Sequence, residues 1–336
     1  IDRSLVGSEM CIRDRYKILP LIMILLKRFM TDFETKDGFI WMDGEFVEWA
    51  EAKIHVLTHT LHYGLGVFEG VRAYLTDEGT KIFRLEDHTN RLFESAQAVN
   101  MQIPFSKSEI NNAQKEIFTK NNLKEGYIRP MCFYGPQGMG LRADNLKTHC
   151  IVAAWEWPSY MSPEAFEKGI KIKISSYKRQ TNNLVSRSKV NGNYVTSIMA
   201  LQEALQEGYD EALLLDDEGN ISEGSGENLF LIKDGEVFTP DLDASLDGIT
   251  RKSIISLAEE DGLKVNIKKL SLEEILQADE LFFTGTAAEV VPIKSVDDSL
   301  IADGKRGKIT TILQRKYFDQ VRGKRTTFSE WLTPIS

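Results

Sequence analysis

Runs of apolar residues alternate with polar turn residues near the start of the chain. The runs at residues 39–42 and 46–49 flank Asp43 and Gly44. An Asp-Gly pair readily takes the positive φ angles of a two-residue turn, so this stretch predicts a β-hairpin. Further apolar runs predict strands at residues 81–85, 127–134 and 149–157.

Two stretches between these strands have the spacing of amphipathic helices. Residues 87–100 predict the first, because their apolar side chains recur on one face of a helix. Residues 108–121 predict the second, with Ser106 or Ser108 as the capping residue at its start. The apolar face of the first helix consists of Leu92, Phe93, Ala96 and Val99.

Prolines and serines interrupt the pattern in the middle of the chain. Pro158 and Pro163 fall there, each next to a serine. Such residues favour turns and loops, so residues 158–169 predict a linker between two domains. The first domain would cover residues 30–157, and the second, larger one residues 170–336.

The second half contains the same two kinds of pattern. Gly208 supplies a stop for one predicted helix, and Ser271 with Glu274 forms a capping box before another. The predicted fold class is α+β, with two mixed domains. Strands are predicted at residues 170–177, 211–215, 228–233 and 236–239, and helices at residues 194–207, 250–260, 272–277 and 308–321.

The composition is that of an ordinary globular protein. Of 336 residues, 42% are apolar and 27% are charged, which suits about two domains. There are 41 Lys and Arg against 50 Asp and Glu, which gives a net charge of −9. An acidic chain lacks the clustered basic residues that phosphates require, so nucleic acid is not expected as a partner. Small molecules or a second copy of the chain are expected instead.

Residues 1–29 differ from the rest. They carry six basic and three acidic residues, and residues 19–26 form an apolar run that is too short to cross a bilayer. No small-x-small cleavage site follows, which argues against the alternative of a secretory or organellar signal. We expect residues 1–29 to be a non-native or disordered tail, with Met30 as the start, and we expect no association with a membrane.

The cysteines indicate a reducing compartment. Cys11, Cys132 and Cys150 form neither a CxxC pair nor an even-numbered disulfide framework. Disulfide-rich patterns are typical of secreted proteins. A cytoplasmic location is therefore expected.

Two patterns that suggest other chemistries are incomplete. His55, His59 and His62 have the spacing that would place three zinc ligands on one side of a helix. Their segment is strand-like at its start and turn-like at its end, and no acidic fourth ligand accompanies it, so we expect packing histidines and no metal. The glycine-rich stretches contain neither GxGxxG nor GxxxxGK[ST], which argues against the common nucleotide-binding loops.

Four short segments of the second half carry groups suited to an anionic aromatic cofactor. Lys189 lies before a predicted helix in SKVNGNY, and Glu223 lies between a turn and a strand in ISEGSGENLF. Thr250 begins a predicted helix, where free backbone N–H groups favour a phosphate. Residues 285–287 follow a strand and can offer N–H groups to an anion. Taken singly, each feature also has an ordinary interpretation. These are a solvated lysine, a carboxylate in a turn, a helix cap and a loop of small residues.

In this order, the four segments resemble those of the fold-type IV pyridoxal-phosphate enzymes, specifically the branched-chain amino-acid aminotransferases. The first half resembles that family as well, through HYGLGVFEGVRAY, HTNRL, YIRP and GMG. The resemblance extends from about Phe39 to Trp331. It implies two α/β domains, of which the second, residues 170–336, binds pyridoxal 5′-phosphate.

The resemblance implies a role for each cofactor-binding residue. Lys189 matches the Schiff-base lysine, which also carries a proton during the reaction. Glu223 matches the carboxylate that keeps the pyridine nitrogen protonated. Tyr194 matches the phenol that binds the ring oxygen of the cofactor. Contacts with the phosphate are implied for Arg91, Ile249, Thr250 and Thr286.

The substrate side is implied in the same way. Tyr127 and Arg129 match a pair that helps to hold carboxylate groups, and Thr286 and Ala287 match the loop whose N–H groups bind the α-carboxylate. An aromatic pocket for the aliphatic side chain is implied for Tyr63, Phe68, Trp157, Tyr160 and Tyr194. A loop of the partner subunit that closes the site is implied for Gly138, Met139 and Leu141, so a homodimer or a hexamer is expected.

The implied activity is the transfer of the amino group of L-leucine, L-isoleucine or L-valine to 2-oxoglutarate in two half-reactions. FEGVR, YIRP and GTAAE favour this branch over D-amino-acid aminotransferases, amine transaminases and aminodeoxychorismate lyases. The alternative outside enzymes is a catalytically silent, cofactor-binding dimer. Two departures from the family pattern, NNLVSRSKVNG and Arg142 in the GPQGMGLRADN loop, leave the substrate range open.

Overall fold

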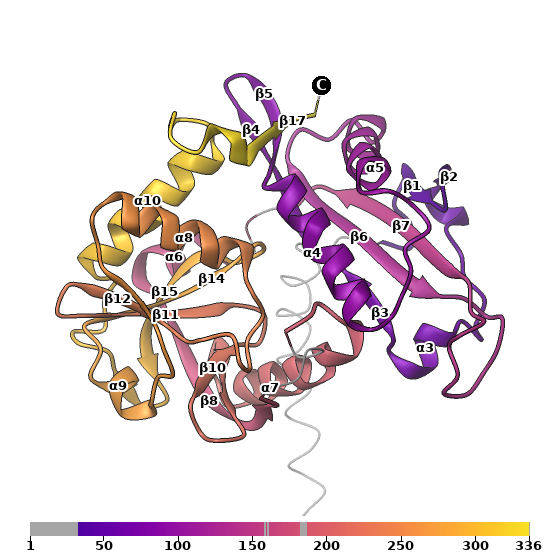
Figure 1. Cartoon of the computed structure of the whole chain (residues 1–336). Coiled ribbons are helices and arrows are strands. Elements are labelled where there is room, and N and C mark those ends of the chain that lie inside the picture. The colour runs from indigo at the N-terminus through magenta and orange to yellow at the C-terminus, as the bar shows by residue number, and fades with distance from the viewer. Residues whose placement is uncertain (1–32, 158, 160, 182–186, 336) are drawn as a thin grey trace, which may run out of the picture.

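The protein folds into two sheet-containing lobes that lie side by side (Figure 1). A computed structural model describes residues 33–157, 159, 161–181 and 187–335. The tail predicted at residues 1–29 lies outside this part of the chain. Among the described residues, no helix is long and apolar enough to cross a membrane.

The first lobe is built on an eight-stranded sheet in the order β17-β5-β4-β6-β7-β1-β2, with β3 paired to β6. The predicted hairpin consists of β1 and β2, and Asp43 (φ 52°) and Gly44 (φ 101°) make its turn. The strands are Phe39–Met42 (β1), Glu45–Glu48 (β2), Gly66–Phe68 (β3), Val71–Thr76 (β4), Gly79–Phe83 (β5), Gly126–Tyr134 (β6), Thr148–Trp155 (β7) and Leu332–Pro334 (β17).

Helices α4 (Leu85–Ala98) and α5 (Lys107–Lys120) pack against each other and against this sheet. Both occur close to the positions predicted from the apolar spacing. Ser106 caps α5, because its hydroxyl accepts the N–H of Glu109 while the Glu109 carboxylate accepts the N–H of Ser106. Leu92 of α4 is fully buried in the core between these helices and the sheet.

The second lobe contains a nine-stranded sheet in the order β10-β9-β8-β15-β14-β11-β12-β13, with β16 paired to β15. An additional antiparallel pairing of β10 with β11 closes the path through β9, β8, β15 and β14 into a ring. The strands are Ile170–Arg179 (β8), Glu211–Asp216 (β9), Ile221–Gly224 (β10), Asn228–Lys233 (β11), Glu236–Thr239 (β12), Val265–Ile267 (β13), Glu280–Gly285 (β14), Glu289–Val296 (β15) and Ser299–Leu300 (β16).

The helices of the second lobe surround this sheet (Figure 1). The predicted capping box of Ser271 and Glu274 is present at the start of α9. Gly208, with φ 87°, follows α7 as predicted. The helices are Pro163–Lys168 (α6), Tyr194–Gln206 (α7), Ile249–Glu260 (α8), Leu272–Leu276 (α9) and Lys308–Val321 (α10). Of these, α6 lies within the segment expected to be a linker.

The two lobes are connected by a common cluster of buried apolar side chains and by the last strand of the chain. Tyr74 and Phe83 of the first lobe are buried in the same cluster as Phe230 and Tyr317 of the second. The last strand, β17, returns to the first sheet and pairs with β5. The division into domains at residues 158–169 remains a prediction.

The histidine-rich segment differs from the expected strand and turn. Its end forms a short helix, α3 (His59–Tyr63), which stops at Gly64 with φ 71°. The local hydrogen bond from Gly64 N–H to the Thr60 carbonyl, 2.9 Å, favours this turn of helix over an extended strand.

The three histidines of this segment bind different backbone groups. A ring nitrogen of His59 lies 2.8 Å from the Gly140 carbonyl. A ring nitrogen of His62 lies 2.9 Å from the Val56 carbonyl. His55 Nδ1 accepts the Leu57 N–H at 3.0 Å. In the part of the chain that the structure describes, no three His, Cys, Asp or Glu side chains are grouped as metal ligands.

Candidate active site

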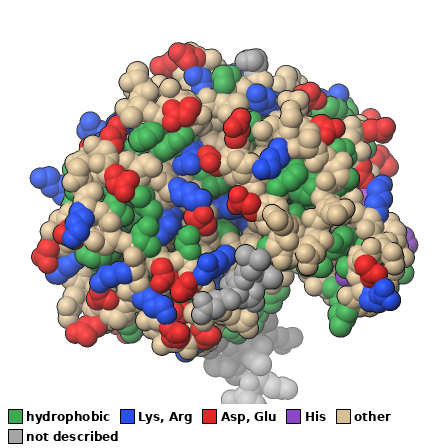
Figure 2. Space-filling model, viewed as in Figure 1, with side chains coloured by type: hydrophobic (Ala, Val, Ile, Leu, Met, Phe, Trp, Pro, Cys, Tyr) green, Lys and Arg blue, Asp and Glu red, His purple; other side chains and the backbone are tan. Residues whose placement is uncertain are grey.

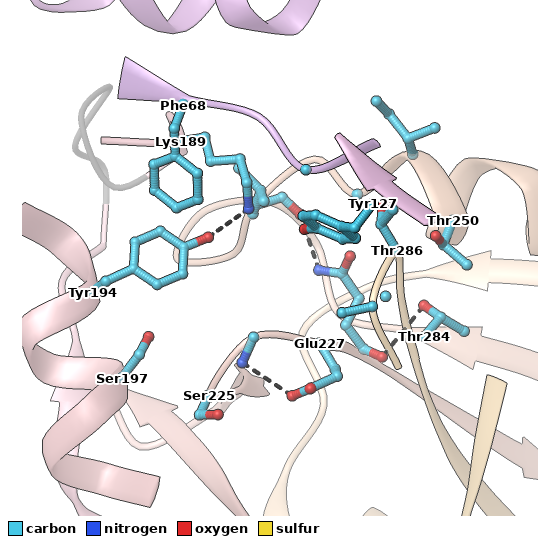
Figure 3. Close-up of a pocket in the computed structure, with 18 of the residues that line it drawn as sticks. Phe68, Tyr127, Lys189, Tyr194, Ser197, Ser225, Glu227, Thr250, Thr284 and Thr286 are labelled. Atoms are coloured by element: carbon cyan, nitrogen blue, oxygen red, sulfur yellow. Dashed lines mark hydrogen bonds between the residues drawn. The ribbon is translucent and has the colours of Figure 1, made fainter. Parts of the chain in front are cut away.

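A cavity of about 300 Å³ lies where the two lobes meet (Figure 3). Its lining comes from β3, α4 and β6 of the first lobe and from α7, α8, β11 and β14 of the second. The cavity brings together most of the site residues predicted from the sequence. These are Phe68, Arg91, Tyr127, Arg129, Trp157, Lys189, Tyr194, Ile249, Thr250, Thr286 and Ala287.

Lys189 projects its amine into this cavity from the segment before α7 (Figure 3). Its backbone is fixed on both sides, because its N–H donates to Ser95 Oγ at 3.0 Å and its carbonyl accepts the Phe68 N–H at 3.1 Å. The side chain is fixed as well, because Nζ donates to the Tyr194 hydroxyl at 2.6 Å. Nζ also lies 4.8 Å from the centre of the Phe68 ring. The amine therefore has a defined position beside a phenol.

One end of the cavity is cationic. The Arg91 guanidinium donates through Nε and Nη2 to the buried carboxylate of Glu69, at 2.7 and 2.9 Å, and through Nη1 to the Asp247 carbonyl at 2.9 Å. Burial would lower the pKa of Arg91, but Glu69 raises it above its usual range. His88 Nδ1 lies 2.7 Å from the same carboxylate. Arg91 is therefore a fixed cation.

The first turn of α8 lies at this end too. Ile249 and Thr250 line the cavity, and Gly248, which precedes them, makes no side-chain cap. A Cβ on Gly248 would lie 1.9 Å from the Asn228 amide oxygen, so only glycine fits there. Free N–H groups at a helix start and a nearby guanidinium are the kinds of group that can bind a phosphate.

Glu223 lies behind the cavity wall, next to two lining residues. Its carboxylate accepts the Leu246 N–H at 3.1 Å and the Asn228 side-chain N–H at 3.4 Å. Arg179 Nη2 approaches the other oxygen at 3.1 Å. Burial raises the pKa of Glu223 above its usual range, although Arg179 and the Leu246 N–H act against this shift.

The wall formed by β6 holds an arginine among aromatic rings. Arg129 has its guanidinium carbon 4.8 Å from the Phe68 ring centre and 5.5 Å from that of Tyr127. Its Nε has no hydrogen-bond partner among the described residues. A Cβ on Gly70 would lie 1.7 Å from the Tyr127 hydroxyl, so this glycine makes room for the phenol. The arrangement offers a cation to a carboxylate within an apolar surface.

Three predicted substrate residues do not line this cavity, and a fourth lies outside the described residues. Tyr63 belongs to α3, and its hydroxyl accepts the Gly140 N–H at 3.0 Å. Met139 and Leu141, in the same loop as Gly140, are exposed to solvent. Arg142 is also exposed and pairs with Asp144. Tyr160 is the residue outside the described part.

Several polar residues of the cavity were not predicted from the sequence. Glu69, His88 and Arg179 act on predicted residues from behind, and Glu227 lines the cavity itself. Burial raises the pKa of Glu227 well above its usual range, with a further contribution from the charge of Glu211. One sequence signal could have found Glu69 and Glu227: each is a single acid in an apolar or glycine-rich run, such as VFEGV for Glu69. An acid in such a run is expected to be buried, and a buried acid seldom lacks a partner.

Comparison with known proteins agrees with this geometry. Residues 66–296 match the family described as amino-transferase class IV. The branched-chain-amino-acid aminotransferase of Pseudomonas aeruginosa is 56% identical over 301 residues, which cover 89% of this chain and 98% of that protein. The enzyme of the same name from Escherichia coli K12 is 41% identical over 304 residues, covering 90% and 98%.

Solved structures give the same result. The crystal structure of the branched-chain amino acid aminotransferase of Escherichia coli superposes with a TM-score of 0.87 at 41% identity, covering 90% of this chain and 100% of that one. A structure of the T.th. enzyme with pyridoxamine 5′-phosphate also gives 0.87, at 43% identity, covering 90% and 99%. The chain therefore belongs to the class IV aminotransferases, within the branched-chain amino-acid aminotransferase branch. The predicted fold-type IV, α+β architecture is confirmed.

Proposed function

We propose that this protein transfers the amino group of L-leucine, L-isoleucine or L-valine to 2-oxoglutarate, with pyridoxal 5′-phosphate as its cofactor. The observation that carries the proposal is the Lys189 amine, held 2.6 Å from the Tyr194 hydroxyl inside a cavity with a cationic end. Membership of the family and the names of the relatives support the same reaction.

The residues present fit this cofactor. Arg91, Thr250 and the free N–H groups of α8 would hold its phosphate, and Tyr194 would hold its ring oxygen. Glu223 would face the ring nitrogen, where its negative charge favours the protonated form. When bound, the cofactor supplies an electron sink that stabilises negative charge at the α-carbon of the substrate.

The chain itself supplies the groups that bind substrate and move a proton. Lys189 Nζ is the base that takes the proton from the α-carbon, and it is also the acid that returns a proton. Arg129, which lines the cavity, offers its guanidinium to a carboxylate, and the segment at Thr286 and Ala287 offers backbone N–H groups. Phe68, Tyr127 and Trp157 provide apolar surface for a branched aliphatic side chain.

We also propose that the protein works as a homodimer or a higher oligomer. Val56 is 75% and Leu141 is 90% exposed, and Leu57, Leu61 and Met139 nearby are also exposed. Adjacent exposed apolar side chains are typical of protein interfaces. Elsewhere, on the face in Figure 2, acidic and basic side chains are intermixed.

We also propose a cytoplasmic location, because the pattern of three cysteines fits a reducing compartment.

The test is the absorption spectrum of the cofactor-loaded protein with L-leucine and, separately, with D-alanine. We expect L-leucine alone to remove the band of the lysine-bound cofactor, and 2-oxoglutarate to restore it. Lys189→Ala should lose the band and reduce transamination by about 10⁴-fold. Lys168→Ala, at an exposed lysine of α6, is the matched control and should behave as the wild type. A response to D-alanine alone would contradict the substrate assignment.

A further inference from the structure

Beneath Arg91 lies a carboxylate that the proposed reaction does not use. Glu69 is fully buried, in the short connection between β3 and β4. Its own backbone is fixed, because its N–H donates to the Pro130 carbonyl at 2.8 Å. Its Oε1 accepts from Arg91 Nε, and its Oε2 accepts from Arg91 Nη2, so it grips one whole edge of the guanidinium.

This grip determines which N–H groups of Arg91 face the cavity. A guanidinium has five N–H donors in a fixed plane. Two of them are used by Glu69, and one is used by the Asp247 carbonyl. The two N–H groups that remain are one on Nη1 and one on Nη2. Arg91 lines the cavity, so these two are available to a ligand there. Glu69 therefore sets the plane and rotation of the guanidinium that a phosphate would meet.

His88 holds Glu69 from the other side. It lies one turn before Arg91 on α4, so both side chains project from the same face of the helix. Its Nδ1 is 2.7 Å from Glu69 Oε2, and the ring is fully buried. Because Glu69 Oε2 is acceptor only, the proton of this hydrogen bond is on His88 Nδ1. Glu69 thus sits between two residues of one helix and cannot rotate away from Arg91.

We propose that Glu69 and His88 are positioning residues for the cofactor phosphate, acting through Arg91. The proposal rests on the proposed function, since it assumes that Arg91 binds the phosphate of pyridoxal 5′-phosphate. It requires that loss of the Glu69 carboxylate weaken binding of the phosphate group specifically. A purely structural role would weaken all ligands of the cavity alike.

The experiment compares two ligands that differ only in the phosphate. Dissociation constants for pyridoxal 5′-phosphate and for pyridoxal are measured on the full chain freed of cofactor, by fluorescence titration. We expect Glu69→Gln to weaken pyridoxal 5′-phosphate by about 10- to 100-fold, the range for one charge-assisted hydrogen bond, and to leave pyridoxal within about twofold. Equal weakening of both ligands would overturn the proposal.

His88 gives a second pair of variants that does not alter the buried charge. His88→Asn retains an N–H donor near the position of Nδ1, whereas His88→Leu removes it. We expect the preference for the phosphorylated ligand to persist in the first variant and to fall by about 3- to 10-fold in the second. If both variants retain the wild-type preference, His88 has no positioning role. This pair also tests the proposal if Glu69→Gln fails to fold.

Glu280→Gln is the matched control. Glu280 accepts N–H groups of Ile309 and Thr310 at the start of α10, away from the cavity lining, so its loss should lower stability and leave the ligand preference unchanged. The wild type separates the two hypotheses. If it binds pyridoxal as tightly as pyridoxal 5′-phosphate, the proposed cofactor site is wrong. If it prefers the phosphate and Glu69→Gln shares that preference in full, only the positioning role is wrong.

Discussion

The two ends of the cavity each bury a glutamate, and the two glutamates have opposite pKa shifts. Burial alone would raise the pKa of Glu69, but the charge of Arg91 and the hydrogen bond from His88 hold it well below its usual range. At the other end burial dominates, and the pKa of Glu223 is raised even though Arg179 lies 3.1 Å away. The same residue type, removed from water in both places, is thus strongly ionised in one and disfavoured as an anion in the other.

The contrast comes from the donors around each carboxylate. Glu69 receives two guanidinium bonds below 3 Å and a third from His88. Glu223 receives longer contacts, and two further acids, Glu211 and Glu227, are buried nearby with raised pKa values. The negative charge of Glu69 is therefore stabilised by donors of the chain itself, without a ligand. At the end at Glu223, the chain stabilises the anionic form incompletely, so a cationic ligand atom, such as a protonated ring nitrogen, would favour the ionised carboxylate.

Among the variants that test the contrast between the two ends, the largest effect is expected from replacing Glu223. Glu223→Gln removes the charge that would keep a ring nitrogen protonated, so we expect kcat to fall by about 10²- to 10³-fold. Because the proposed phosphate site at Arg91 is intact, we expect the affinity for pyridoxal 5′-phosphate to change much less. Steady-state kinetics with L-leucine and 2-oxoglutarate, together with ligand titration, measure both quantities.

The control for this prediction is Glu223→Asp, which keeps the charge on a shorter side chain and should retain more activity than the Gln variant. The comparison between the two ends predicts that Glu69→Gln acts mainly on affinity and Glu223→Gln mainly on turnover. If Glu223→Gln weakens cofactor binding and leaves kcat unchanged, that division is wrong.

Opposite pKa shifts predict opposite pH dependences of stability. The comparison uses Glu69 at one end and, at the other, Glu227, a cavity-lining acid whose pKa is raised in part by the charge of Glu223. Glu69 has a lowered pKa, so its contribution is present above its ordinary value of 4.5 and is lost as the pH falls below it. Glu227 has a raised pKa, so its contribution is present below 4.5 and is lost as the pH rises through its value in the folded protein. Each ionisation changes the free energy of unfolding by at most about 1.4 kcal/mol per pH unit.

Chemical unfolding of the cofactor-free protein at a series of pH values measures these slopes. We expect Glu69→Gln to flatten the loss of stability on the acid side, and Glu227→Gln to flatten the loss as the pH rises above 4.5. Glu280→Gln should leave both slopes in place, since Glu280 lies away from the cavity lining. Identical pH profiles for the Glu69 and Glu227 variants would remove the contrast between the two ends.

The elements that the sequence predicted well are those with local hydrogen-bond signals. The capping box at Ser271 and Glu274, and the turn at Asp43 and Gly44, each satisfy their own backbone groups within a few residues. By contrast, β4 and β15 were not predicted. Both are largely buried on both faces, so they lack the alternation of apolar and polar residues that marks a half-exposed strand. Each pairs with a sequence neighbour, β5 or β14, and with a more distant strand, β6 or β8.

The same division holds for the site. Lys189, Glu223 and Thr250 were found because each lies in a segment whose local pattern resembles a known family. Glu69 and Arg179, which act on the charges at the two ends, were missed. Glu69 is 22 residues from Arg91, its predicted partner, and Arg179 meets Glu223 only when β8 and β10 join one sheet. Their role depends on tertiary contact, so it becomes visible only in the folded structure.

Arg179 offers a smaller test of the Glu223 end. It donates to Ser197 Oγ at 2.7 Å and to the Asn193 carbonyl at 3.3 Å, and so ties Glu223 to the helix that carries Tyr194. Arg179→Gln removes a cation beside a carboxylate that is already disfavoured as an anion, so we expect kcat to fall by about 10-fold. Arg179→Lys should recover part of this loss in the same assay. An unchanged kcat in Arg179→Gln would mean that the Leu246 N–H and the Asn228 side chain hold Glu223 without help from Arg179.

The smallest predicted effect concerns the Thr250 hydroxyl at the proposed phosphate site. It lies in the first turn of α8, where the backbone N–H groups already favour an anion, so it adds one hydrogen bond to a site that Arg91 and Glu69 have largely completed. We expect Thr250→Val to weaken pyridoxal 5′-phosphate by about 2- to 10-fold, the effect of one neutral hydrogen bond, and to leave pyridoxal unchanged. Thr250→Ser, which keeps the hydroxyl, is the control in the same titration. A loss as large as that of Glu69→Gln would show that this end is not complete without Thr250, and that the contrast between the two ends is overstated.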